Sequence, residues 1–168
     1  MIFLILMYTV NRSLGKFNDI LNSLIGIESA ILAGFFYAEY HDQSLLVNQV
    51  ALALAVGGAI FTIIGSILSL FGITDFVLAG WYLATGNGFI SLWLVILCYS
   101  LLGFGGWPHN IAIFGIVAGA FMAIGLFSIP GIFMAIDSME SLPWYLYIAF
   151  VGWFGTYILY PIWAIWLG

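Results

Sequence analysis

Long apolar runs separated by short polar breaks dominate this sequence and limit the folds that are open to it. A helix that rises about 1.5 Å per residue needs roughly 20 apolar residues to cross a bilayer. Four uninterrupted runs reach that length: Ile20 to Ala38, Val47 to Phe71, Ile111 to Ala135 and Trp144 to Leu167. A fifth run, Phe76 to Phe104, is interrupted by Thr85-Gly86-Asn87-Gly88, which we interpret as a break or tight turn.

The scarcity of charge excludes a water-soluble fold. Only 5% of the residues are charged and 65% are hydrophobic, whereas a soluble domain carries about 25% charged residues. Open sheet edges are not stable in hydrocarbon, and the alternating pattern of a membrane barrel is absent. The sequence therefore predicts an all-α, polytopic transmembrane helix bundle that forms one transmembrane domain over residues 1–168 of a multi-pass protein in a lipid bilayer.

The N-terminal run Ile2 to Val10 is too short to cross a bilayer, so we expect a half-span ahead of five full spans. A cleavable signal peptide is not expected, because the basic residues follow this run instead of preceding it. Arg12 and Lys16 are the only basic residues, and the positive-inside rule places the segment Asn11 to Asp19 in the cytoplasm. The later loops should then alternate between the two sides.

Charge and motif content argue against several functional classes. A net charge of −5 with two basic residues leaves no surface for nucleic acid. The single cysteine, Cys98, permits no internal disulfide and no cysteine-based metal site, and we expect it to be a small buried hydrophobe. The sequence lacks a nucleophile elbow, a phosphate-binding loop and an HExxH helix, so we expect no cofactor and favour a protein that is not an enzyme.

Polar residues and prolines mark the expected helix boundaries and kinks. Thr74 is predicted to cap a helix that Asp75 opens, and Pro143 lies at the first turn of the last helix. Pro130 and Pro161 fall inside apolar runs, where each removes a backbone hydrogen bond. Both helices should therefore be kinked.

Small residues at helical spacing predict where helices approach closely, because lipid competes equally for large apolar side chains. Three stripes qualify: Gly26, Ala30, Gly34 and Ala38; Gly58, Thr62 and Ser66; and Gly115, Gly119 and Ala123. Hinges are a less favoured interpretation of these glycines.

Glu28 is the main candidate for a functional residue, because a carboxyl at membrane depth is costly and suggests function by default. On a helix it points away from the stripe that contains Gly26. One interpretation is a proton or cation site, or an anchor for a polar head group. The other is a protonated glutamic acid that bonds a neighbouring helix through Ser23, Ser29 or a carbonyl.

Other polar and aromatic residues carry weaker hypotheses. His41, Asp42 and His109, with Glu39, lie in loops on one side and could bind a divalent metal, although solvated loop residues are the favoured interpretation. Asp137 and Glu140 are interpreted as loop residues. Aromatic side chains near the ends of the runs predict interfacial belts. These are Tyr37, Tyr40, Trp81, Tyr82, Trp107, Trp144, Tyr145, Tyr147, Tyr160, Trp163 and Trp166.

The last third of the chain carries a resemblance. Gly115-Ile116-Val117-Ala118-Gly119, Leu142-Pro143-Trp144-Tyr145 and the closing residues Tyr160 to Gly168 resemble uncharacterised multi-pass prokaryotic membrane proteins of about six helices. The resemblance implies a helical membrane fold in a prokaryotic cell membrane, and it supplies no catalytic or binding residue.

Two functional hypotheses follow. The favoured one is a non-enzymatic accessory or structural subunit that packs against itself or a larger membrane complex, because short loops leave little surface outside the membrane. The alternative is a carrier or channel for a small solute, ion or lipid, with Glu28 in a midplane cavity.

Overall fold

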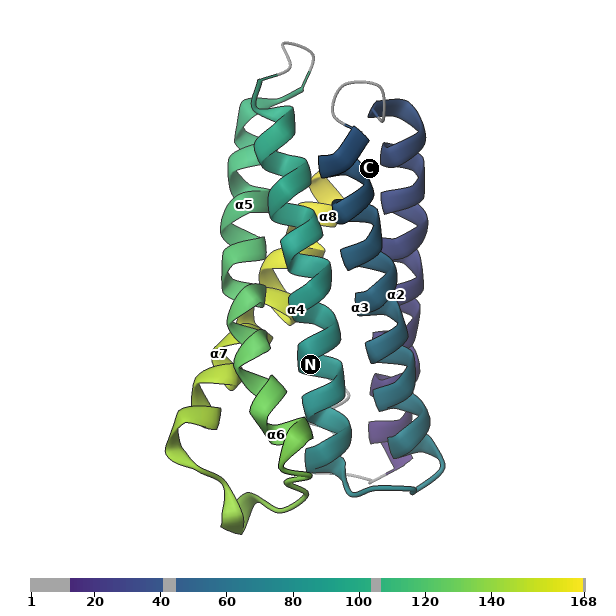
Figure 1. Cartoon of the computed structure of the whole chain (residues 1–168), viewed down its shortest axis with the longest axis vertical. Coiled ribbons are helices and arrows are strands. Elements are labelled where there is room, and N and C mark those ends of the chain that lie inside the picture. Colours follow the sequence, from purple (N-terminus) through teal and green to yellow (C-terminus); the bar gives the residue numbers. More distant parts are fainter. Residues whose placement is uncertain (1–12, 41–44, 104–106, 168) are drawn as a thin grey trace.

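The computed structural model describes residues 13–40, 45–103 and 107–167, and five long helices account for most of them (Figure 1). Each is long and apolar enough to cross a membrane: Gly15–Tyr40, Leu46–Leu70, Phe76–Leu101, His109–Phe133 and Trp144–Leu167. The described residues form no strand. The chain is therefore an all-α, multi-pass membrane protein with the predicted five spans, and the expected half-span Ile2 to Val10 lies outside the described residues.

The first three spans are continuous α-helices, α2 (Ser13–Tyr40), α3 (Leu45–Leu70) and α4 (Phe76–Leu101). The fourth combines α5 (His109–Ala123), the 3₁₀ segment η2 (Ile124–Ser128) and α6 (Ile129–Phe133). A short 3₁₀ turn, η3 (Met139–Ser141), lies in the loop that follows. We call Trp144–Leu167 the C-terminal helix; its parts are η4 (Trp144–Phe150), α7 (Val151–Phe154), the π-helical η5 (Gly155–Leu159) and α8 (Tyr160–Leu167).

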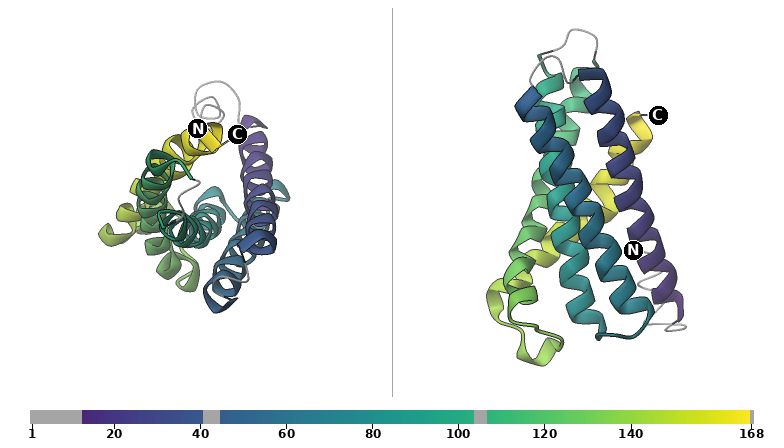
Figure 2. Two further views of the ribbon diagram at one scale, coloured as in Figure 1. Left: turned by 90° about the horizontal axis from the view of Figure 1, so that it is seen from above. Right: turned by 45° about the vertical axis from the view of Figure 1, so that its right-hand side comes forward.

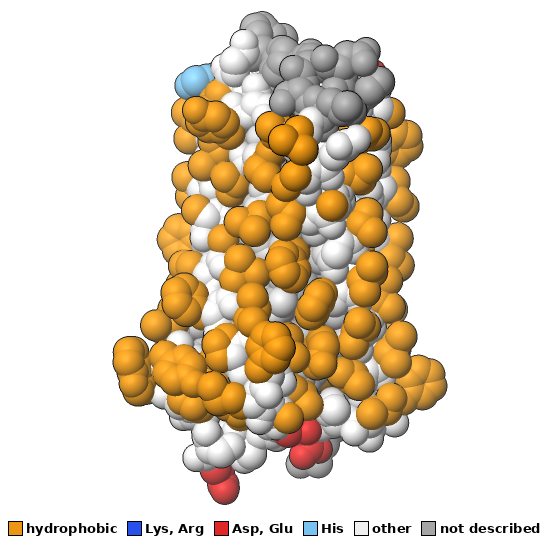
Figure 3. All heavy atoms as spheres, viewed as in Figure 1, with side chains coloured by type: hydrophobic (Ala, Val, Ile, Leu, Met, Phe, Trp, Pro, Cys, Tyr) orange, Lys and Arg blue, Asp and Glu red, His pale blue; other side chains and the backbone are white. Residues whose placement is uncertain are grey.

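The helices run side by side, and their connections alternate between the two ends of the bundle (Figures 1 and 2). The upper end holds the end of α2 and the start of α3, and the lower end holds the connection from α3 to α4. Apolar side chains cover the visible flank, while acidic side chains gather at the lower end (Figure 3). An apolar flank with charge at one end suits a protein surrounded by lipid.

The first span begins earlier than the apolar run suggested. Asn18 and Asp19 belong to α2 and to the span Gly15–Tyr40, whereas the sequence placed them in a cytoplasmic segment. Both side chains are buried, so they face neighbouring helices instead of lipid. Polar residues extend a membrane helix without difficulty when they lie on its inner side.

α4 is the central helix and the most buried of the five spans. The predicted interruption at Thr85-Gly86-Asn87-Gly88 is wrong, because α4 continues through all four residues and buries them. A break inside the membrane would leave backbone N–H and C=O groups unpaired in hydrocarbon, which favours the continuous helix. The glycines act instead at contacts, since a Cβ on Gly88 would lie 2.6 Å from Leu126 Cδ2.

Glycines also set the distance between α3 and α4. A Cβ on Gly58 would lie 2.6 Å from the Gly86 carbonyl oxygen, and a Cβ on Gly86 would lie 2.6 Å from the Gly58 carbonyl oxygen. Contacts this short exclude any side chain at either position unless the helices move apart. We refer to these two residues as the Gly58–Gly86 contact.

The other glycines of the predicted stripes differ in their surroundings. A Cβ on Gly26 would collide with Thr62 Oγ1, one on Gly115 would lie 2.6 Å from Trp163 Nε1, and one on Gly119 would lie 2.6 Å from Val95 Cγ2. Gly34 differs, because beyond its chain neighbours and the backbone of its own helix no heavy atom lies within 4 Å of its Cβ position. At Gly34 the first stripe therefore does not mark a close helix contact, and Ala30 is partly buried.

Both internal prolines accompany a change of helix type. Before Pro130, α5 gives way to the 3₁₀ segment η2, in which the Ile129 N–H bonds the Leu126 carbonyl. The Ser128 hydroxyl lies 2.6 Å from the Gly125 carbonyl oxygen and donates to it. Before Pro161, the C-terminal helix widens into the π-helical η5. Proline removes one helical N–H, and these local changes redistribute the remaining backbone bonds.

Three of the interfacial aromatic predictions are wrong for a shared reason. Trp81, Tyr160 and Trp163 are 2%, 6% and 0% exposed, so they pack inside the bundle. Trp81 donates its indole N–H to the Ile136 carbonyl oxygen at 3.0 Å. Position along a helix fixes the distance of a residue from the bilayer surface, but the side of the helix decides whether it meets lipid.

Candidate functional site

Glu28 lies at the middle of the first span and its side chain is exposed. Its neighbours along the same face are exposed apolar residues, with Ile27 and Ile31 at 40% and 54%. Glu28 is close enough to Tyr160 of α8 for an electrostatic interaction. The structure thus places this carboxyl on the outer surface of α2, at the edge that borders the C-terminal helix.

Polar side chains join α2 to the C-terminal helix. Ser29 and Tyr160 hydroxyl oxygens lie 2.8 Å apart, and Ser29 donates its hydrogen to the Ile25 carbonyl at 2.7 Å. Tyr160 must therefore be the donor to Ser29, because Ser29 has only one hydrogen to give. Further down, the Asn22 amide donates to the Tyr157 hydroxyl at 3.2 Å. We call these four residues the polar seam.

A second polar group lies at the lower end of the polar seam, where α2 meets α3. Ser69 Oγ donates to Asp19 Oδ2 at 2.6 Å, and Ser66 Oγ donates to the Asp19 backbone carbonyl at 2.7 Å. The Asn18 side chain lies beside both the Asp19 carboxyl and Tyr157. We call Asn18, Asp19, Asn22, Ser69 and Tyr157 the Asp19 cluster.

The residues of the Asp19 cluster on α2 are deeply buried. Asn18, Asp19 and Asn22 are 3%, 2% and 1% exposed. Despite this burial, Asp19 Oδ1 and Asn18 Nδ2 make no hydrogen bond. A buried polar atom without a partner is costly, so these two atoms mark the cluster as a place where a ligand or proton would be stabilised.

The sequence contains a polar pattern on α2 that the apolar runs alone do not reveal. Asn18, Asn22 and Ser29 follow each other at intervals of four and seven residues, which places them on one side of a helix. Glu28 lies about 100° around the helix from Ser29, at the edge of this inner side. A helical projection begun at Ser13 instead of Ile20 would have separated an inner polar side from an outer apolar one.

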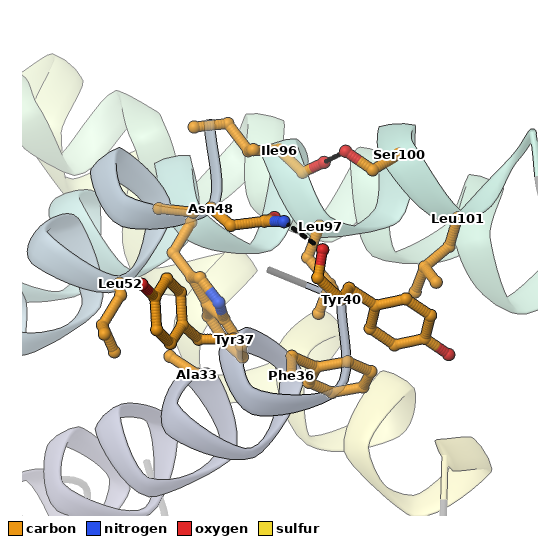
Figure 4. Close-up of a pocket in the computed structure, with 12 residues that line it drawn as sticks. Ala33, Phe36, Tyr37, Tyr40, Asn48, Leu52, Ile96, Leu97, Ser100 and Leu101 are labelled. Atoms are coloured by element: carbon orange, nitrogen blue, oxygen red, sulfur yellow. Dashed lines mark hydrogen bonds between the residues drawn. The ribbon is translucent and has the colours of Figure 1, made fainter. Parts of the chain in front are cut away.

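The upper end of the bundle contains a pocket of about 170 Å³ between α2, α3 and α4. Figure 4 shows Tyr37 and Tyr40 of α2 near Asn48 of α3, whose amide donates to the Tyr40 carbonyl oxygen at 2.6 Å. Ser100 of α4 also lines it. Its described lining residues carry no charge, and they offer polar, aromatic and aliphatic contacts.

The described residues do not bring predicted metal ligands together. His109 is exposed at the start of α5, while His41 and Asp42 lie outside the described residues. Among residues 13–40, 45–103 and 107–167, no group of three His, Cys, Asp or Glu side chains could hold a metal ion.

Asp137 is more than a loop residue, because it caps a distant helix. Its Oδ2 accepts from the Asp75 N–H at 2.7 Å and its Oδ1 accepts from the Leu78 N–H at 2.9 Å. The prediction that Thr74 caps this helix is wrong: Asp75 is the N-cap residue, and the Thr74 hydroxyl is buried without a hydrogen bond. A carboxylate satisfies free N–H groups at a helix start and complements the helix dipole.

Fold and site together define a multi-pass helical membrane protein with polar side chains concentrated between α2 and the helices beside it. Comparison with known protein families, curated proteins and solved structures finds no match to this chain. Its function must therefore be argued from its own residues.

Proposed function

We propose that this protein is a non-enzymatic subunit of a membrane complex, and that it binds a helix of another membrane protein through the outer face of α2. We define this face by six exposed residues: Ile20, Leu24, Ile27, Glu28, Ile31 and Phe35. The resemblance of the last third of the chain to prokaryotic membrane proteins extends the proposal to a prokaryotic cell membrane.

The observation that carries the proposal is the exposure of Glu28 at the middle of a membrane span. A carboxyl that faces lipid at this depth costs about 2.5–3.5 kcal/mol even on permissive scales. A partner helix that offers a hydrogen-bond donor would remove much of this cost. The partner chemistry that fits is therefore an apolar helix with one donor, such as a serine, asparagine or basic side chain, opposite Glu28.

The low burial of α2 supports the same proposal. Its span is the least buried of the five, at 22%, against 67% for α4. It packs on α3 along its length, whereas its backbone meets the C-terminal helix at few points. A helix that the other described residues leave mostly uncovered has surface left for a second protein.

Site-specific photo-crosslinking in native membranes tests the proposal. We expect a photoreactive residue at Ile31, on the outer face, to give a discrete protein adduct that is lost when Glu28→Leu is added. A photoreactive residue at Ile113, exposed on α5, is the matched control and should give lipid adducts only. Lipid adducts alone from both positions, or an Ile31 adduct that survives Glu28→Leu, would contradict the proposal.

The second candidate is a carrier for a proton or small solute, and the polar seam favours it. The α2 side chains of the polar seam, Asn22 and Ser29, lie about two helical turns apart and bond Tyr157 and Tyr160 of the C-terminal helix. Glu28 lies beside them. Proteoliposomes that contain a pH-sensitive dye test this candidate. Proton uptake that depends on Glu28 would support a carrier. A rate of proton entry equal to that of protein-free vesicles would contradict proton transport.

A further inference from the structure

Asp19 is a buried carboxyl with only half of its hydrogen-bonding capacity used. It is 2% exposed, and its Oδ2 accepts from Ser69 while its Oδ1 has no partner. An ionised carboxylate in such a place needs compensation by a positive charge, because desolvation of an uncompensated ion costs several kcal/mol or more.

No basic side chain of the described residues supplies that charge. Lys16 is the only lysine or arginine among them; its side chain is exposed, whereas Asp19 is buried, and the two form no ion pair within the described residues. His109 lies at the start of α5, at the opposite end of the bundle. Within the described residues, a proton or a mobile cation is left to compensate the charge of Asp19.

The atoms around Asp19 are suited to a cation. Ser69 Oγ and the Tyr157 hydroxyl are oxygens, and the side-chain amides of Asn18 and Asn22 each carry one more. The Asn18 nitrogen has no hydrogen bond, so exchange of the amide O and N positions loses none at the nitrogen and brings an oxygen to the site. Hard cations prefer oxygen ligands of this kind.

The charge of the site selects the class of cation. Asp19 is the only carboxylate in the cluster, so a monovalent cation would be neutralised, whereas a divalent cation would retain a net positive charge in a low-dielectric interior. We propose that the Asp19 cluster binds a small monovalent cation, for which sodium is the test ion. Its ligands come from α2, α3 and η5, so the bound ion holds these three elements together.

Thermal unfolding in detergent tests the site on the whole chain. We expect sodium chloride to raise the Tm of the wild type by about 3 °C or more over choline chloride at equal ionic strength, since a ligand that binds only the folded state stabilises it. Asp19→Asn should abolish the shift. Glu140→Gln, which removes an exposed carboxyl outside the cluster, should retain it.

A second measurement keeps the proposal testable if Asp19→Asn does not fold. Ser69→Ala and Tyr157→Phe each remove one oxygen, and we expect both to weaken binding of radioactive sodium to the purified protein. A wild type with the same Tm in sodium and choline and no bound sodium would overturn the proposal. A sodium shift that persists in Asp19→Asn would also overturn it. Neither outcome bears on the outer face of α2, so the proposed function is tested separately.

Discussion

The α3–α4 interface and the polar seam solve the same problem, the joining of two membrane helices, by opposite means. At the Gly58–Gly86 contact, backbone meets backbone and no side chain intervenes. At the polar seam, the backbones stay apart and the hydroxyl and amide groups of four side chains connect them. Close packing gains dispersion contacts along the whole interface, whereas a few hydrogen bonds act only at their own positions.

The difference predicts which interface is rigid and which can open. Separation of α3 from α4 would lose many contacts at once. Separation of α2 from the C-terminal helix would cost two side-chain hydrogen bonds, each worth about 0.6 kcal/mol on average inside membrane proteins. We therefore expect α2, when no ion is bound at the Asp19 cluster, to move relative to the C-terminal helix while it remains packed on α3.

The largest effect should come from Gly58→Ala, which breaks the close-packed interface. The new Cβ would lie 2.6 Å from the Gly86 carbonyl oxygen and 2.9 Å from the Ile90 backbone nitrogen, neither of which can move without its helix. We expect a loss of about 3 kcal/mol in stability, measured by unfolding in detergent. Gly57→Ala is the matched control, since beyond its chain neighbours and the backbone of its own helix no heavy atom lies within 4 Å of its Cβ position. Equal losses in the two variants would refute the close-packing account.

The next effect concerns the start of α4, one of the two helices of the α3–α4 interface. Asp137→Ala removes both acceptors that cap Asp75 and Leu78, and we expect it to lower stability by about 1–2 kcal/mol. Asp137→Asn keeps one acceptor and should give an intermediate loss. Glu140→Ala, in the same loop and exposed, should change stability by less than about 0.5 kcal/mol. An equally large loss in Glu140→Ala would mean that loop charge, not capping, is responsible.

A smaller effect should appear in the polar seam. A double-mutant cycle of Ser29→Ala and Tyr160→Phe isolates their hydrogen bond, and we expect a coupling of about 0.6 kcal/mol. Tyr99→Phe, exposed on α4, serves as the control for loss of a tyrosine hydroxyl. A coupling as large as the loss in Gly58→Ala would remove the proposed contrast between the two interfaces.

The smallest effect lies outside both interfaces and checks the scale of the others. Ala135 has a φ of 50°, a left-handed conformation in which its Cβ is strained. Relief of the strain is partly offset by the greater freedom of glycine in the unfolded chain. We expect Ala135→Gly to raise stability by about 0.5 kcal/mol, and Gly72→Ala, with a φ of 63°, to lower it. A loss of stability in Ala135→Gly would contradict this account.

The number of spans could be predicted from the sequence because bilayer thickness fixes the length of an apolar run, and 26 residues of α4 cross it even with two glycines and an asparagine at the centre. The same rule failed at Asn18 and Asp19, since the end of an apolar run is not the end of a helix. The turn signal around Gly86 also failed, because hydrocarbon disfavours a break in a membrane helix.

The candidate site was less accessible to prediction, because its chemistry depends on contacts between distant parts of the chain. Glu28 could be singled out from its depth alone. The roles of Asp19 and Asp137 could not, since Ser69 lies 50 residues from Asp19 and Asp75 lies 62 residues before Asp137. Such partners are chosen by helix packing, and that information is spread over the whole sequence.

The mutual contact of Gly58 and Gly86 has an evolutionary consequence. Because each residue occupies the space that a side chain on the other would need, neither position gains freedom to vary unless the interface itself is rebuilt. Descendants of this gene that keep the α3–α4 pairing should carry glycine at both positions, while Gly57, one residue away, should drift freely. The pair would then act as a sequence signature by which remote relatives could be recognised.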